Sequence, residues 1–119
     1  MIFHITTLQE WEKALVKGEY VANSLIEEGF IHCSTLYQTT DTANIFFKGQ
    51  TGMVILCINE HNLESGIKYE SPISEGHHDP DVGTLFPHVY GPINLSAVIK
   101  VVKFPPDENG FFSLPNELI

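Results

Sequence analysis

The hydrophobic and polar positions at the start of the chain predict a strand followed by a helix. Residues 2–6 form a short run of β-favouring side chains. Behind it, Thr7 and Glu10 have the spacing of a capping box, which predicts a helix through about Lys17 that Gly18 ends. The apolar residues of this helix recur at intervals of three and four, and they are Trp11, Ala14 and Leu15.

A second strand and a second helix follow. Residues 30–34 have the composition of a strand, and residues 35–48 predict a helix capped by Ser34 or Thr35. Gly49 stands just beyond its end, where a glycine commonly terminates a helix. The apolar side predicted for this helix consists of Ala43, Phe46 and Phe47.

The second half of the chain is richer in strand signals. Residues 53–58 are apolar on both faces, which is typical of a strand in the middle of a sheet, and residues 67–70 predict a shorter strand as its neighbour. Residues 71–85 lack any periodicity and read as an exposed loop, while residues 89–90 and 97–104 supply the last strands. Helices early and strands late, without a repeating order, predict an α+β fold.

Composition narrows the picture to one domain with an acidic surface. A chain of 119 residues with 43% hydrophobic side chains suits one domain, 1–119, with one packed core. The formal net charge is −9, with six lysines and no arginine. Because duplex binding is largely neutralisation of phosphates by a basic face, we expect no nucleic-acid partner, and no anionic membrane surface either.

The location and the state of the cysteines follow from short sequence features. The longest apolar run, residues 53–58, is too short to span a bilayer, and no export signal is visible, so we expect a soluble, cytoplasmic protein. Cys33 and Cys57 lack CxxC spacing and read as buried free thiols, with a disulfide or a reactive thiol as the alternative.

Polar residues inside the predicted strands are the main functional signal, because burial of a polar group is costly unless the group is paired or used. Alternation places His4 on one face with Thr6, and His88 on one face with Tyr90. Three histidines therefore come from three strands or strand ends, which can converge on a cleft. The complete set is His4, His32, Ser34, Glu70, His88 and Tyr90.

Other readings of the same residues stay open. Each histidine could donate one ring proton to a backbone carbonyl and pack as a core residue. Three neutral imidazoles could also hold a zinc ion with one position left for water. Residues 77–81, with two histidines and two aspartates, are more typical of a solvated loop. Glu70 could be a general base, an acceptor for a ribose hydroxyl, or an exposed strand end.

Covalent catalysis and phosphate-loop chemistry find little support in the sequence. Ser34 follows His32 and Cys33, but on an extended strand Cys33 points away from His32, and no oxyanion-hole glycines stand nearby. Neither GxGxxG nor GxxxxGK[ST] is present, so the two common glycine-rich nucleotide motifs are missing.

Two strings of residues carry a family resemblance that runs over nearly the whole chain. They are Glu28 to Ser34, EGFIHCS, and Phe86 to Pro92, FPHVYGP, supported by residues 3–6, Trp11 and residues 43–44. With these motifs the sequence resembles the domain of unknown function 952 family, which is composed of uncharacterised bacterial and plant proteins.

The resemblance implies an ADP-ribosyltransferase-like fold, in which small split antiparallel or mixed sheets form a cleft for NAD or a related nucleotide, with two main helices in the N-terminal half. It implies that His4 grips the adenosine-side ribose, that Ser34 lies beside the nicotinamide pocket, and that Glu70 or a later residue is the third-motif acid. Transferases of this fold usually bring an arginine or a basic pocket to the pyrophosphate, and this chain has no arginine.

The leading hypothesis is therefore a cleft that binds or processes NAD or ADP-ribose-type nucleotides by glycosyl transfer or hydrolysis at a ribose carbon, with NAD as a possible cofactor. Glu70 and His4 are the predicted catalytic residues. A non-catalytic small-molecule binding module and a zinc-dependent hydrolase that uses a histidine cluster are the alternatives. The predicted ligand-binding residues are His32, Ser34, Thr6, His88 and Tyr90.

Overall fold

The computed structural model describes residues 1–71 and 85–119, and within them it has the predicted α+β class. Most of the loop predicted at 71–85, including the cluster at 77–81, lies outside the described residues. The central sheet is antiparallel, in the order β1 (Ile2–Thr7), β4 (Met53–Ile58) and β8 (Val98–Lys103). As predicted, β4 is the middle strand, and all of its side chains are buried.

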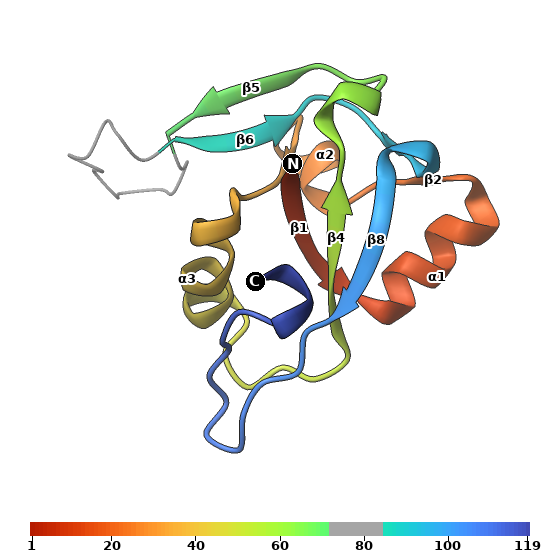
Figure 1. Ribbon diagram of the computed structural model, residues 1–119. Helices are drawn as coiled ribbons and strands as arrows, with labels where there is room; N and C mark the ends of the chain where they lie inside the picture. Colours follow the sequence, from red (N-terminus) through yellow and green to blue (C-terminus); the bar gives the residue numbers. More distant parts are fainter. Residues whose placement is uncertain (72–84) are drawn as a thin grey trace.

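Two smaller antiparallel sheets complete the fold. One joins β2 (Glu19–Tyr20) to β7 (Ile93–Asn94), and the other has the order β3 (Ile31–His32), β6 (Phe86–Val89) and β5 (Ile67–Glu70). The prediction that β5 neighbours β4 is wrong. Both edges of β4 are already taken by β1 and β8, so β5 pairs with β6 in another sheet. Figure 1 shows β5 and β6 crossing over one end of the central sheet.

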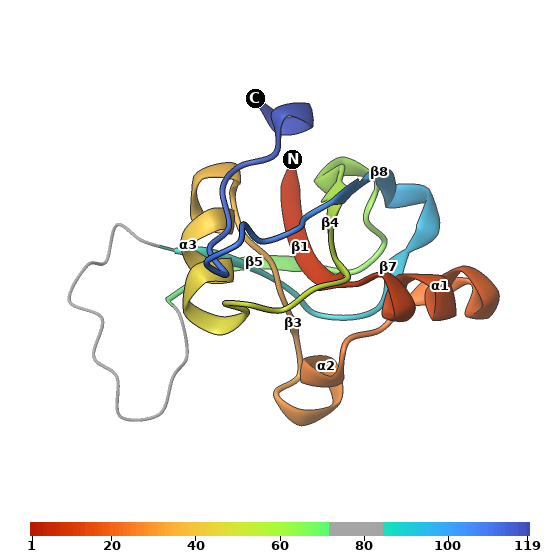
Figure 2. The same cartoon turned by 90° about the horizontal axis from the view of Figure 1, so that it is seen from below.

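Both predicted helices begin at their capping signals, but only the first ends as predicted, because the second stops at Phe46 with Phe47 as its cap, before Gly49. In α1 (Leu8–Lys17), Thr7 Oγ1 accepts a hydrogen bond of 3.0 Å from the backbone N–H of Glu10, and Gly18 closes the helix with φ 98°. The helix α3 (Leu36–Phe46) starts with a capping box between Thr35 and Gln38. Figures 1 and 2 place α1 and α3 on opposite sides of the central sheet, and the short α2 (Asn23–Glu27) lies between them in the sequence.

The apolar faces predicted for α1 and α3 are correct only in part. Ala14 and Ala43 are buried, but Leu15 is 54% exposed and Phe46 is 66% exposed. Leu15 follows Ala14 by about 100° around the helix axis, and this rotation carries its side chain off the narrow buried stripe. Three 3-10 turns, η1 (Glu60–Asn62), η2 (Leu95–Ala97) and η3 (Asn116–Leu118), connect or end the remaining segments.

Alternation along the central sheet divides the core into two apolar clusters. One side of β1 and β4 contributes Ile2 and Leu56 to a cluster that also contains Ile31 and Val89 of the β3-β6-β5 sheet. The other side contributes Phe3 and packs on α3 and the C-terminal segment. The free thiols of Cys33 and Cys57 are buried as predicted, and burial raises the pKa of the Cys33 thiol. None of the helices in the described ranges could cross a membrane.

The register of the β3-β6-β5 sheet decides where the candidate residues meet. His88 of β6 stands opposite His32 of β3 on one side and opposite Lys68 of β5 on the other. The sheet is attached to the central one through Phe3 and Ser34, whose backbones exchange two hydrogen bonds of 2.8 and 2.7 Å. These pairings fix three strands from distant parts of the sequence beside one another.

Candidate functional site

One face of the β3-β6-β5 sheet is apolar and the other carries polar side chains. Ile31, Cys33 and Val89 belong to the core. Because successive residues of a strand point to opposite faces and paired residues point to the same face, the other face carries His32 and His88. The side chains gathered on this face, which we call the histidine face, are Phe30, His32, Lys68, Glu70, His88 and Tyr90.

Glu70 joins two of the predicted residues. Its Oε1 accepts a hydrogen bond of 2.9 Å from His88 Nδ1 and one of 2.5 Å from the Tyr90 hydroxyl. The hydrogen bond from Tyr90 lowers the pKa of Glu70 most, and the hydrogen bond from His88 lowers it further. The hydrogen bond between Tyr90 and Glu70 also raises the pKa of Tyr90. Glu70 is therefore a carboxylate at neutral pH, held at the end of β5.

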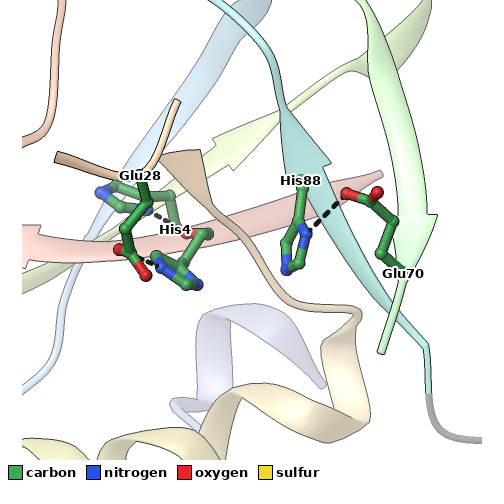
Figure 3. A network of polar contacts seen from close by, with 5 residues as sticks. His4, Glu28, Glu70 and His88 are labelled. Carbon is green, nitrogen blue, oxygen red and sulfur yellow. Dashed lines mark hydrogen bonds and ion pairs between the residues drawn. The ribbon is translucent and has the colours of Figure 1, made fainter. Parts of the chain in front are cut away.

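The contact with Glu70 determines which nitrogen of His88 is protonated. A carboxylate only accepts, so Nδ1 carries the proton, and Nε2 of the neutral ring holds a lone pair. Burial lowers the pKa of His88, so the neutral form prevails at pH 7. Figure 3 shows the ring hanging from β6 with one nitrogen turned to Glu70. Nε2 is buried and has no hydrogen-bond partner within the described structure.

Aromatic stacking holds the imidazole of His88 in place. The rings of Phe30 and His88 are stacked, with centroids 4.1 Å apart and planes inclined by 17°. Phe30 also contacts the ring of Tyr90 at 5.4 Å. His88 is consequently 1% exposed, although Tyr90 beside it is 37% exposed. The rotamer of His88 is therefore fixed from two directions, by the carboxylate of Glu70 and by the phenyl ring.

A second histidine–carboxylate pair borders the first. His32 Nε2 lies 2.8 Å from Glu28 Oε2, and both side chains are largely exposed. The rings of His32 and His88 meet edge to face with centroids 5.4 Å apart. Glu28 was missed among the candidate residues, although it opens the EGFIHCS string. Glu28 lies outside the predicted strand, separated from it by Gly29, so strand alternation could not indicate that it contacts His32.

His4 occupies a buried network on the core side instead of the histidine face. Its Nδ1 donates to the carbonyl oxygen of His32 at 2.5 Å, and its Nε2 lies 2.7 Å from the Tyr20 hydroxyl. Since Nδ1 carries the proton, Nε2 accepts from Tyr20, whose oxygen in turn lies 2.9 Å from Thr6 Oγ1. Burial lowers the pKa of His4 to about 4. Figure 3 shows this ring well apart from Glu70.

The structure thus brings together four of the predicted residues and keeps three apart. His32, Glu70, His88 and Tyr90 share the histidine face with Phe30. His4 and Thr6 lie in the core network, and Ser34 is 4% exposed and pairs with Phe3 through its backbone. In residues 1–71 and 85–119, no group of three histidine, cysteine or acidic residues could hold a metal ion.

Two hollows in the described surface lie away from the histidine face. One of about 350 Å³ is bordered by Lys103–Pro105 and by residues 113–117, and a smaller one of about 160 Å³ lies along α1. Neither contains an imidazole or a cysteine. The residues with the chemistry of a site are those of the histidine face.

The sequence and the fold both match known proteins. A family model described as "Protein of unknown function (DUF952)" matches residues 5–101. The chain belongs to the DUF952 family. A search of curated proteins finds no match. Both strings that carry the family resemblance contribute to the histidine face. EGFIHCS contains Phe30 and His32, and FPHVYGP contains His88 and Tyr90.

Solved structures of one bacterial protein share the whole fold. The crystal structure of Protein CC0527 from Caulobacter crescentus is 32% identical, with a TM-score of 0.80 over 98% of this chain and 96% of that one. The solution NMR structure of the same protein is 30% identical, with a TM-score of 0.77 over 98% and 94% of the two chains. The shared fold therefore extends over nearly all of this chain.

Proposed function

We propose that this DUF952 protein binds a nucleotide of the NAD or ADP-ribose class on the histidine face and transfers or hydrolyses it at a ribose carbon. The observation that carries the proposal is the lone pair of His88 Nε2, which is buried and has no partner in residues 1–71 and 85–119. An unmet buried acceptor costs about 1–3 kcal/mol, and a hydroxyl donor on a ligand would remove that cost. A hydroxyl or water bound there is also in contact with a general base.

The proposed step is a displacement at the ribose carbon that bears the leaving group. The oxygen of a bound water or acceptor hydroxyl forms a bond to this carbon, and the glycosidic bond breaks, with its electron pair going to the departing base. The proton of the attacking hydroxyl moves to His88 Nε2. Glu70, at 2.9 Å from Nδ1, stabilises the imidazolium that results.

The proposal changes the roles of the two residues predicted to be catalytic. Glu70 becomes the positioning residue for His88, as the carboxylate of a histidine–carboxylate pair. His4 becomes a positioning residue for the backbone of His32, because both of its ring nitrogens bond within the chain. The implied likeness to the ADP-ribosyltransferase fold supports the choice of substrate, as does the presence of small antiparallel sheets that face one another across a shared core.

The test is binding and turnover with defined nucleotides. Calorimetric titration with ADP-ribose measures affinity, and chromatography of an NAD incubation measures release of nicotinamide. We expect Glu70→Gln, which keeps an acceptor for His88 Nδ1, to bind ADP-ribose and to lower turnover about 100-fold or more. His88→Phe, which can still stack on Phe30, should lose turnover completely.

The matched control is His61→Gln, because His61 is exposed on η1 and, among the described residues, forms its hydrogen bond through its backbone. It should behave like the parent protein. Equal turnover in the parent, Glu70→Gln and His88→Phe proteins would overturn the catalytic assignment.

A second candidate function is binding without catalysis. His88 is 1% exposed beneath Phe30, so Nε2 is poorly placed to pass a proton to solvent after a reaction, and this favours a role in holding a ligand donor. In that case ADP-ribose and NAD would bind and His88→Phe would weaken both, while no nicotinamide would form in any variant.

A further inference from the structure

The histidine face holds one lysine, and its position gives it a definite place in the site. Of the six lysines, Lys13 and Lys17 lie on α1, Lys100 and Lys103 lie on β8, and Lys48 stands over the ring of Phe111. The sixth is Lys68. With no arginine in the chain, Lys68 is the permanent cation among the side chains that we defined as the histidine face.

The strand register sets Lys68 directly beside the proposed base. Lys68 is the cross-strand partner of His88, so the two side chains leave the sheet on the same face. Its Nζ lies 5.0 Å from the centroid of the Tyr90 ring, which is a cation–π distance. Tyr90 is itself held by Glu70 through its hydroxyl. The ring of Tyr90, which Glu70 holds in place, therefore positions the ammonium group of Lys68 at the edge of the histidine face.

Among residues 1–71 and 85–119, Lys68 makes no ion pair with a protein carboxylate. Glu70 uses Oε1 for His88 and Tyr90 and attracts Lys68 without pairing with it, and Glu28 is engaged with His32. Without a cation, these two carboxylates would repel a phosphate brought to the face. Lys68 is exposed, so a ligand in solution can reach it.

We propose that Lys68 binds a phosphate group of the ligand while a ribose hydroxyl of the same molecule donates to His88 Nε2. Neighbouring strands lie about 4.8 Å apart, so Lys68 and His88 leave the sheet close enough for one nucleotide to contact both. The inference rests on the proposed function and narrows it. The site selects a phosphorylated ribose compound over a nucleoside, and Lys68 determines that selectivity.

The experiment compares ligands with and without phosphate. Calorimetry measures the affinities of ADP-ribose and adenosine for the parent protein, for Lys68→Gln and for Lys103→Gln, an exposed lysine of the central sheet that serves as control. We expect Lys68→Gln to weaken ADP-ribose about tenfold or more and to leave adenosine unchanged. The affinity of the parent protein for ADP-ribose should also fall with added salt, and that of Lys68→Gln much less.

Inorganic pyrophosphate separates this inference from the proposed function. If ADP-ribose does not bind but pyrophosphate raises the unfolding temperature of the parent protein and not that of Lys68→Gln, the anion site stands and the nucleotide assignment falls. If ADP-ribose binds equally to Lys68→Gln and Lys103→Gln, the assignment of Lys68 is overturned and the nucleotide site remains. Failure of both probes to bind the parent protein overturns both.

Discussion

His4 shows how a polar residue in a strand can serve the fold as well as a site. It donates to a carbonyl of β3 and accepts from Tyr20, so one ring links the central sheet to the two smaller ones. Nδ1 donates to the carbonyl in either protonation state, but Nε2 accepts from Tyr20 only in the neutral ring, because an imidazolium would present a second donor to that hydroxyl at a buried position. This residue therefore makes the fold sensitive to acid.

The pKa of His4 gives a pH dependence with a definite sign. The folded pKa of about 4 lies below the usual 6.5, so between these values the unfolded chain binds a proton that the folded one rejects. The stability contributed by His4 is complete above about pH 6.5 and is lost as the pH falls towards 4. From pH 7 to pH 4.5 the loss should be about 2 kcal/mol.

Urea unfolding of the parent protein and of His4→Gln at the two pH values checks this prediction. Other titrating groups are common to both proteins, so their contributions cancel in the difference. The free energy of unfolding of the parent should fall by about 2 kcal/mol more than that of the variant. Equal losses in the two proteins would show that His4 titrates normally.

At the scale of single residues, sequence reasoning found the chemistry but not the partners. His4, His32 and His88 stood out because imidazoles in strands need a partner or a use. Which of them is satisfied depends on the carbonyl of residue 32 and on the hydroxyl of Tyr20, and neither has a sequence signal. The stacking of Phe30 on His88 likewise needs the β3–β6 register, which joins residues more than fifty positions apart.

At the scale of elements, the turn between β6 and β7 holds the end of the histidine face. Ser65, just before β5, donates its hydroxyl to the carbonyl oxygen of Pro92 at 2.6 Å. A Cβ added at Gly91 would lie 2.4 Å from Ser65 Oγ and 3.0 Å from Ser65 Cβ. Glycine is required at position 91 because Ser65 leaves no room for a side chain there. The contact also fixes the backbone next to Tyr90, the last residue of the histidine face.

We therefore expect Gly91→Ala to lower the free energy of unfolding by about 1–3 kcal/mol through overpacking. Ser65→Gly removes both clashing atoms, so Gly91→Ala should cost much less in a Ser65→Gly background than in the parent protein. Denaturant unfolding of the four proteins gives this coupling. Additive effects of the two changes would contradict the proposed contact.

Helices and strands were predictable to the extent that local signals decide them. Thr7 and Gly18 bound α1 because caps act within one turn, and residues 53–58 form the middle strand because an apolar run has no solvated face. The partner of β5 was not predictable, because strand pairing is settled by which edges other strands leave free. The exposure of Phe46 shows the same limit, since a helix face is buried only where something covers it.

At the scale of the whole molecule, one side chain connects the last segment of the chain to α3. Asn44 donates to the carbonyl oxygen of Phe112 at 3.1 Å and accepts from the backbone N–H of the same residue at 2.7 Å. Phe112 packs with Phe104 in the apolar cluster on the face of the central sheet that carries Phe3. This double contact bridges 68 positions in the sequence.

Asn44→Ala should lower the free energy of unfolding by about 2 kcal/mol, because it leaves a donor and an acceptor of Phe112 without partners. Asn44→Asp keeps the acceptor, so its effect should be smaller. Thr42→Ala, on the same helix, is the control. Hydrogen exchange should show faster exchange of the Phe112 amide in Asn44→Ala, and unchanged exchange there would count against the connection.

The position of β4 has a consequence for synthesis on the ribosome. Its six residues pair with β1 as soon as they emerge, but the other edge waits for β8, which begins 40 residues after β4 ends. At roughly 5–20 residues per second, that edge stays open for about 2–8 s. An uncharged apolar strand with an unpaired edge is a template for pairing with other chains. Until β8 is made, this edge of β4 is therefore the part of the nascent chain most open to pairing with neighbouring chains.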